Sequence, residues 1–109
     1  MNRIREASAT ATGVFMTEEV RAQDNVVSVQ ITSVGSGGVI TPQVSNDGVT
    51  WVTTTGNIIG AGGAQTATTL SAAGIFVYMV QARFFRLNAT AITSGTISTH
   101  TCFGEGWTK

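Results

Sequence analysis

The sequence predicts an all-β chain, an antiparallel β-sandwich of jelly-roll-like form with about seven short strands. Three observations favour this class. Thr, Val, Ile and Gly dominate, with 13 glycines and one proline in 109 residues, which is typical of strands and turns. Several segments alternate apolar and polar residues, the pattern of a strand with one buried face. No segment carries apolar residues at helical spacing over the length of a helix.

The chain is expected to hold one domain, since compact domains run to roughly 100–150 residues. Residues 1–25 are expected to form an extended N-terminal arm, and residues 26–109 a single sandwich domain with a short C-terminal tail. The arm segment is mostly small and polar and shows no convincing period. A disordered terminus is the alternative, although Val14, Phe15 and Met16 give an arm apolar side chains to bury.

Three strands are expected in the first half of the domain. Residues 26–34 alternate cleanly and predict a half-buried strand. Its inward-facing residues are expected to be Val27, Val29 and Ile31. Residues 39–45 make a second strand, in which Pro42 cannot donate a ladder hydrogen bond, so that strand is expected at an edge or bulged. Residues 49–54 make the third strand.

A tight hairpin turn is expected between the second and third strands. Asn46 and Asp47 tolerate left-handed backbone, and Gly48 adopts positive φ without steric cost. Trp51 is then expected to pack on the sheet. We interpret this stretch as a structural turn rather than a ligand loop.

The segment 55–74 is rich in Gly, Ala and Thr and is expected to be a long crossover containing one short strand at 65–70. Such a long loop is unusual in an isolated compact domain and more natural where a neighbouring subunit covers it. Residues 75–81 form a continuous apolar run, which is consistent with a strand buried on both faces.

The last two strands are expected at 84–92 and 97–103. The first alternates again, with inward-facing residues expected at Phe85, Leu87, Ala89 and Ala91. Ser94 and Gly95 lie in the short turn between the strands, where glycine permits positive φ.

Charged residues make up only 11% of the chain, and six Lys/Arg balance six Asp/Glu, whereas about 25% is usual. Either a polar surface keeps a monomer soluble, or much of the surface is buried against other subunits, which is the favoured interpretation. The basic residues form no dense run, so neither nucleic acid nor an anionic membrane is an expected partner. No apolar run approaches the roughly 20 residues of a membrane span, and no secretory signal is expected.

No catalytic or metal-binding pattern emerges, so we expect neither an enzyme nor a cofactor. His100 and Cys102 are the only histidine and cysteine. They share one face of a predicted strand, but nothing orients the imidazole as a nucleophile's base requires. Zinc needs more such ligands, and Asp47 alone supplies too few carboxylates for calcium. The glycine-rich segments 35–38 and 60–63 lack the Gly-Lys-Ser/Thr of a phosphate loop.

Carbohydrate binding is a further hypothesis, because an exposed aromatic ring beside Asn or Asp can stack on a sugar. Trp51, Tyr78 and Trp107 are the candidate aromatics. Trp107 lies in the tail, where an aromatic side chain is more often an anchor on a neighbouring subunit.

Residues 43–51 read QVSNDGVTW, and residues 84–97 read FFRLNATAITSGTI. These segments resemble a module of tailed-bacteriophage virion proteins, in which V-S-N-D-G-x-x-W is followed by (Y/F)-(V/F)-R-(V/L)-x-(V/A)-T-A-x-T-S-G-T. The similarity spans residues 26–103. In that module Arg86 corresponds to the arginine of the penultimate strand and Trp51 to the hairpin tryptophan. The N-terminal segment and the ending THTCFGEGWTK depart from the pattern.

The resemblance implies a non-enzymatic virion structural protein, and we expect a capsid decoration (cement) protein. Such a protein would be made in the host cytoplasm, bind the outer shell of the virion as a homotrimer and bridge subunits of the major capsid protein. A tail, neck or head-fibre component is one alternative, and a carbohydrate-binding module for cell-surface recognition is another. The predicted assembly contacts are Arg3, Arg5, Val14, Phe15, Met16, Phe103 and Trp107.

Overall fold

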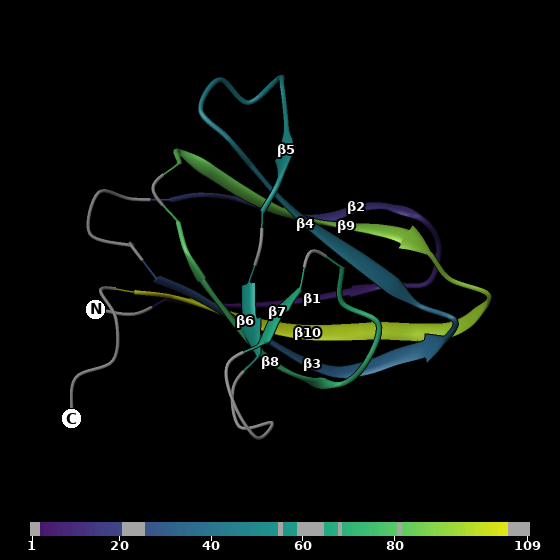
Figure 1. Cartoon of the computed structure of the whole chain (residues 1–109). Coiled ribbons are helices and arrows are strands. Elements are labelled where there is room, and N and C mark those ends of the chain that lie inside the picture. The colour runs from purple at the N-terminus through teal and green to yellow at the C-terminus, as the bar shows by residue number, and fades with distance from the viewer. Residues whose placement is uncertain are drawn as a thin grey trace.

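The computed structural model describes residues 3–20, 26–54, 56–58, 65–67, 69–80 and 82–104. These residues form ten strands in two antiparallel sheets that face each other (Figure 1). The predicted antiparallel β-sandwich is therefore confirmed. Among the described residues there is no helix long and apolar enough to cross a membrane.

The larger sheet has six strands in the order β1-β10-β3-β8-β6-β7. Their bounds are β1 (Arg3–Ala9), β10 (Ser94–Gly104), β3 (Val26–Ser36), β8 (Gly74–Met79), β6 (Gly56–Ile58) and β7 (Gln65–Ala67). Strands β6 and β7 form a small hairpin at one end of this sheet, within the predicted crossover.

The smaller sheet has four strands in the order β2-β9-β4-β5. Their bounds are β2 (Gly13–Glu19), β9 (Phe84–Ala91), β4 (Val39–Ser45) and β5 (Val52–Thr53). Apart from the β6–β7 hairpin, the chain passes repeatedly between the two sheets and leaves eight strands in two four-stranded layers. That arrangement is the jelly-roll topology.

The core is the layer of side chains between the sheets, and alternation along β3 and β9 fills much of it. Val27, Val29 and Ile31 on β3 point inward, as predicted. On β9 the predicted Phe85, Leu87 and Ala89 are buried as well, but Ala91 is exposed because β9 ends there.

Three aromatic rings form the centre of this core. The ring centroids of Tyr78 and Phe85 are 5.5 Å apart, and those of Phe85 and Phe103 are 6.2 Å apart at near right angles. Edge-to-face and tilted pairs of this kind add about 0.5–1.5 kcal/mol beyond the burial of their area. Tyr78 and Phe103 are thus part of the core rather than of the surface.

The apolar run around β8 is buried on one face only, so the prediction of a strand buried on both faces is wrong. Phe76 and Tyr78 point into the core, whereas Ile75 is 37% exposed. The outer face of the six-stranded sheet carries no covering layer among the described residues. The apolar segment 75–81 therefore contains a strand with one buried and one exposed face.

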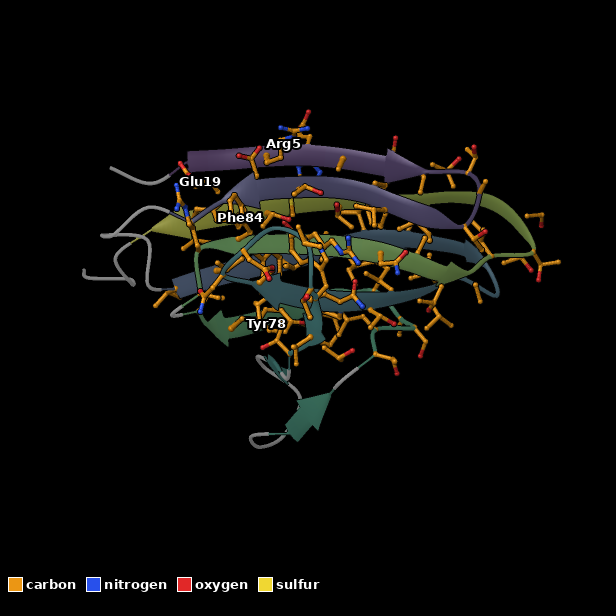
Figure 2. The ribbon with its side chains drawn as sticks, turned by 90° about the horizontal axis from the view of Figure 1, so that it is seen from above. Arg5, Glu19, Tyr78 and Phe84 are labelled. Atoms are coloured by element: carbon orange, nitrogen blue, oxygen red, sulfur yellow. The ribbon has the colours of Figure 1, made fainter. Side chains whose placement is uncertain are left out.

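Residues 3–20 belong to the sandwich, so the predicted arm outside the fold is wrong for this segment. Strand β1 pairs along its whole length with β10, and β2 pairs with β9. Met16 is only 2% exposed. The two strands border the same side of the sandwich, where Arg5 lies on β1 (Figure 2). The Arg5 guanidinium reaches the Glu18 carboxylate on β2 at 2.5 Å.

Pro42 lies in β4 between β9 and β5, so β4 is not an edge strand, contrary to the prediction. The Pro42 carbonyl accepts a hydrogen bond of 3.0 Å from the amide of Thr54. Because the N–H and C=O groups of a strand residue point the same way, the missing donor faces β5 and not β9. Since β5 pairs only with Gln43 and Val44, proline costs the sheet no bond to β9.

Candidate functional site

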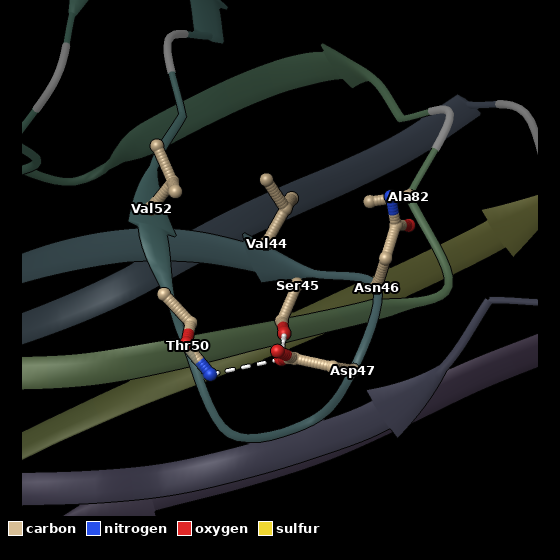
Figure 3. Close-up of a pocket in the computed structure, with 7 residues that line it drawn as sticks. All are labelled: Val44, Ser45, Asn46, Asp47, Thr50, Val52 and Ala82. Carbon is tan, nitrogen blue, oxygen red and sulfur yellow. Dashed lines mark hydrogen bonds between the residues drawn. The ribbon is translucent and has the colours of Figure 1, made fainter.

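The loop 46–51 between β4 and β5 is organised by one carboxylate (Figure 3). Oδ1 of Asp47 accepts hydrogen bonds from the amides of Val49 and Thr50, at 2.9 and 2.8 Å, and from the hydroxyl of Ser45 at 2.9 Å. The amide of Gly48 donates to Oγ of Ser45 at 2.9 Å. These bonds, with those from the two amides largest, lower the pKa of Asp47 to about 2.

This connection is longer than the tight turn that the sequence predicts. Gly48 has a φ of 75°, as expected, but among the described residues no residue other than glycine has positive φ. Asn46 and Asp47 therefore act through their side chains rather than through left-handed backbone. The interpretation of the stretch as structural holds for Asn46 too, since its Oδ1 accepts the amide of Arg83 at 3.0 Å and ties this loop to the start of β9.

A shallow cavity of about 240 Å³ lies beside this loop. Its lining residues are Val44, Ser45, Asn46, Asp47, Thr50, Val52 and Ala82 (Figure 3). Oδ1 of Asp47 and Oδ1 of Asn46 are already engaged in the loop's own hydrogen bonds. In the described part of the chain no three His, Cys, Asp or Glu side chains gather as metal ligands.

A second cluster lies on the outer face of the four-stranded sheet. The guanidinium carbon of Arg86 sits 4.1 Å from the centroid of the Trp51 ring, and Nε of Arg86 donates to Oε1 of Gln43 at 2.8 Å. Phe84 lies beside Trp51, with ring centroids 6.4 Å apart. The pairing of Gln43 with Arg86 across β4 and β9 brings this cluster together.

Sequence reasoning named Trp51 and Arg86 separately but did not bring them together. The alternation along the predicted strands placed Arg86 outward, and that signal was correct. The partner of Arg86 depends on the register between β4 and β9, which no local pattern specifies.

Charges elsewhere in the described residues are paired. Arg5 contacts Glu18, and Nε of Arg83 lies 3.4 Å from Oε2 of Glu19. Nδ1 of His100 lies 3.3 Å from Oε1 of Glu6. Arg86 differs, because no carboxylate of the described chain lies within ion-pair distance of it.

His100 and Cys102 lie on the outer face of the six-stranded sheet. His100 pairs with Glu6 across β1 and β10. Burial raises the pKa of the Cys102 thiol, which disfavours the thiolate that a nucleophile needs. The geometry thus gives the thiol no activating partner among the described residues.

The predicted assembly contacts are placed very differently from one another. Val14 is 45% exposed and Arg5 is exposed, but Phe15 is half-buried against the core. Met16 and Phe103 are core residues and cannot reach a neighbour while the sandwich is intact. The side chain of Arg3 and all of Trp107 lie outside the described residues.

Two further predictions concern single positions. Tyr78 is fully buried and cannot stack on a sugar. Ser94 and Gly95 open β10, and Gly95 has a φ of 82° at a register irregularity rather than in a free turn.

Comparison with known proteins finds a similar fold but no similar sequence. No protein-family model and no curated protein sequence matches the chain. The solved structure of the SPBc2 prophage-derived protein YomS is similar, with a TM-score of 0.79 over 94% of each chain and 8% sequence identity. A structure of Bacillus endospore appendages, described as disulfide-linked pili, gives a TM-score of only 0.29 over 97% of this chain and 90% of the other, also at 8% identity. The chain therefore shares the fold of YomS.

Proposed function

We propose that this chain is a non-enzymatic structural protein of a bacteriophage virion that decorates the outer surface of the capsid. The observation that carries the proposal is the near full-length similarity to a prophage-derived protein. The segments QVSNDGVTW and FFRLNATAITSGTI, which resemble a virion module, support it independently.

The surface supports a role in assembly. The most exposed of the large apolar side chains in the described residues are Val49 (82% exposed), Ile4 (73%) and Val52 (61%). Val49 and Val52 lie on the hairpin that leads into β5, which projects from the body of the sandwich (Figure 1). Exposed apolar groups on a projecting hairpin suit insertion into a neighbouring subunit.

The proposed partners are the major capsid protein and further copies of this chain as a homotrimer. A low charge content suits a surface that other subunits cover. Repetition over a symmetric shell would give firm attachment from modest individual contacts. The contact surface includes Ile4 and the projecting hairpin, in place of the core residues Met16 and Phe103.

A shell-binding experiment tests the proposal. Purified chain is mixed with shells of the encoding phage that lack it, and bound protein is measured after sedimentation. Saturation at a fixed number of copies per shell is expected, with weaker binding for Val49→Glu and near-normal binding for Val49→Thr. Absence of binding to these shells would contradict a capsid role.

The second candidate function is a tail, neck or head-fibre component, since the segments that resemble a virion module do not distinguish a head protein from a tail protein. In that case the chain would bind tails or portal assemblies in the same sedimentation experiment and leave the shells unoccupied.

A further inference from the structure

We propose that the outer face of the four-stranded sheet binds a carboxylated saccharide, with Arg86 taking the carboxylate and Trp51 bordering the sugar ring. Trp51 lies between Val49 and Val52 on the projecting hairpin, so this site borders the proposed assembly contact but uses other side chains. The inference goes beyond the proposed structural function and does not depend on where the chain sits in a particle.

Arg86 supplies the reason to expect an acidic ligand. It is half-buried, and no carboxylate of the described residues lies within ion-pair distance of it. Its Nε donates a hydrogen bond to Gln43, and the guanidinium stacks on the Trp51 ring. The guanidinium is therefore oriented before a ligand binds. The two terminal nitrogens hydrogen-bond to no described residue, and a guanidinium edge of this kind matches a carboxylate with two parallel hydrogen bonds.

The neighbouring side chains favour a sugar over a protein surface. Thr17 lies opposite Arg86 on β2, and Thr41 lies opposite Asn88 on β4. The hydroxyls of Thr41 and Thr90 are 3.2 Å apart. These uncharged hydroxyl and amide groups can exchange hydrogen bonds with sugar hydroxyls, whereas a protein hot spot is normally ringed by groups that exclude water.

Trp51 supplies the apolar part of the surface. Its ring is half-buried, so part of the indole remains open to solvent beside Arg86. A pyranose can pack its C–H groups against the open part of this half-buried indole, while a carboxylate on the same sugar reaches the guanidinium. An aromatic surface with a few oriented polar groups is the usual composition of a small-ligand site.

The test uses defined probes. Binding of trigalacturonate, a sialylated trisaccharide and a hyaluronan tetrasaccharide is measured by calorimetry at low salt, with neutral galactotriose as the matched control for trigalacturonate. At least one acidic probe is expected to bind about tenfold or more tightly than the neutral one, because a hydrogen bond to a charged group contributes about one to two powers of ten. Its affinity should fall as salt is raised.

Thr17→Glu separates ligand binding from a merely structural role of the Trp51–Arg86 stack. Thr17 is exposed and faces Arg86 across the strand pair, so the new carboxylate would occupy the guanidinium without removing it. We expect a loss of about tenfold or more in affinity for the acidic probe. Glutamine has the shape of glutamate without its charge, so the affinity of Thr17→Gln for the acidic probe should stay within about twofold of that of the parent chain. Neither variant should lower Tm.

Three results would overturn the inference. One is that none of the three acidic probes binds. Another is that neutral and acidic probes bind equally well. The third is that Thr17→Glu and Thr17→Gln bind the acidic probe alike. If acidic sugars fail but Arg86→Gln abolishes attachment to shells, the surface is a protein interface and the saccharide proposal is wrong, while the structural function stands.

Discussion

Thr99 and Thr101 provide a matched pair for testing how hydrogen bonding stabilises this sandwich. Both face inward from β10, and they are 2% and 0% exposed. The hydroxyl of Thr99 donates to the carbonyl of Ala7 on β1 at 3.2 Å. The hydroxyl of Thr101 has no hydrogen-bond partner among the residues that the structure describes. Replacing each residue by valine keeps the shape of the side chain and exchanges the hydroxyl for a methyl group.

The two substitutions should change the free energy of unfolding in opposite directions. Thr99→Val loses a hydrogen bond worth about 0.5–1.5 kcal/mol. Thr101→Val removes a buried hydroxyl whose unsatisfied desolvation costs about 1–3 kcal/mol in proteins. The variants should therefore differ by about 3 kcal/mol, with Thr101→Val the more stable.

Equilibrium unfolding in urea measures this difference. With a slope of about 2 kcal/mol per molar urea for a small protein, the two midpoints should lie about 1.5 M apart. The reasoning is refuted if Thr101→Val destabilises the fold as much as Thr99→Val does. That result would mean that the Thr101 hydroxyl is bonded in solution, for example by a buried water.

Three further predictions follow from the same structure. Tyr78→Phe should raise Tm, since the buried Tyr78 hydroxyl has no partner in the described part of the chain and the ring contact with Phe85 survives; a lower Tm would contradict this. Met16→Ala should cost about 2–5 kcal/mol in urea unfolding because β2 belongs to the core, whereas an arm outside the fold would lose almost nothing. The pKa of Asp47 lies near 2 instead of 3.8, so its stabilising contribution is complete above pH 3.8 and lost as the pH falls toward 2. Asp47→Asn should therefore lower Tm at pH 7 and flatten the fall in Tm between pH 4 and 2, while an unchanged acid profile would show that the carboxylate does not hold the loop.

The strands at 39–45, 75–81 and 97–103 were predicted and match β4, β8 and β10, but the inward-facing residues were predictable only where the period of two is clean. Residues 26–34 and 84–92 became β3 and β9 because their apolar residues alternate without interruption. The jelly-roll class followed from the number of such segments and from the absence of a helical period.

The N-terminal strands escaped prediction for identifiable reasons. On β1 the inward positions hold Arg5, Ala7 and Ala9, a charged residue and two small ones, so no apolar period is visible. On β2 a register irregularity between Val14 and Met16 inserts Phe15, which interrupts the alternation. Inward charges and bulges at edge strands discourage pairing with other chains. The same features remove the apolar alternation by which a strand is recognised in the sequence.

The candidate site was only partly predictable. The sequence identified Asn46, Asp47 and Gly48 as structural and Trp51 as a packing residue. It could not show that Asp47 collects three hydrogen bonds, because these depend on the path of the whole loop. The stacking of Arg86 on Trp51 likewise depends on the pairing of strands that are distant in the sequence.

The copy number of this chain in purified virions tests the central claim most directly. Quantitative mass spectrometry against the major capsid protein gives the number of copies per particle. A capsid decoration protein predicts a number that scales with the shell lattice, on the order of hundreds of copies, set by the symmetric repetition of the shell. A dozen copies or fewer would place the chain in the neck or tail, and its absence from virions would contradict a structural role in the particle.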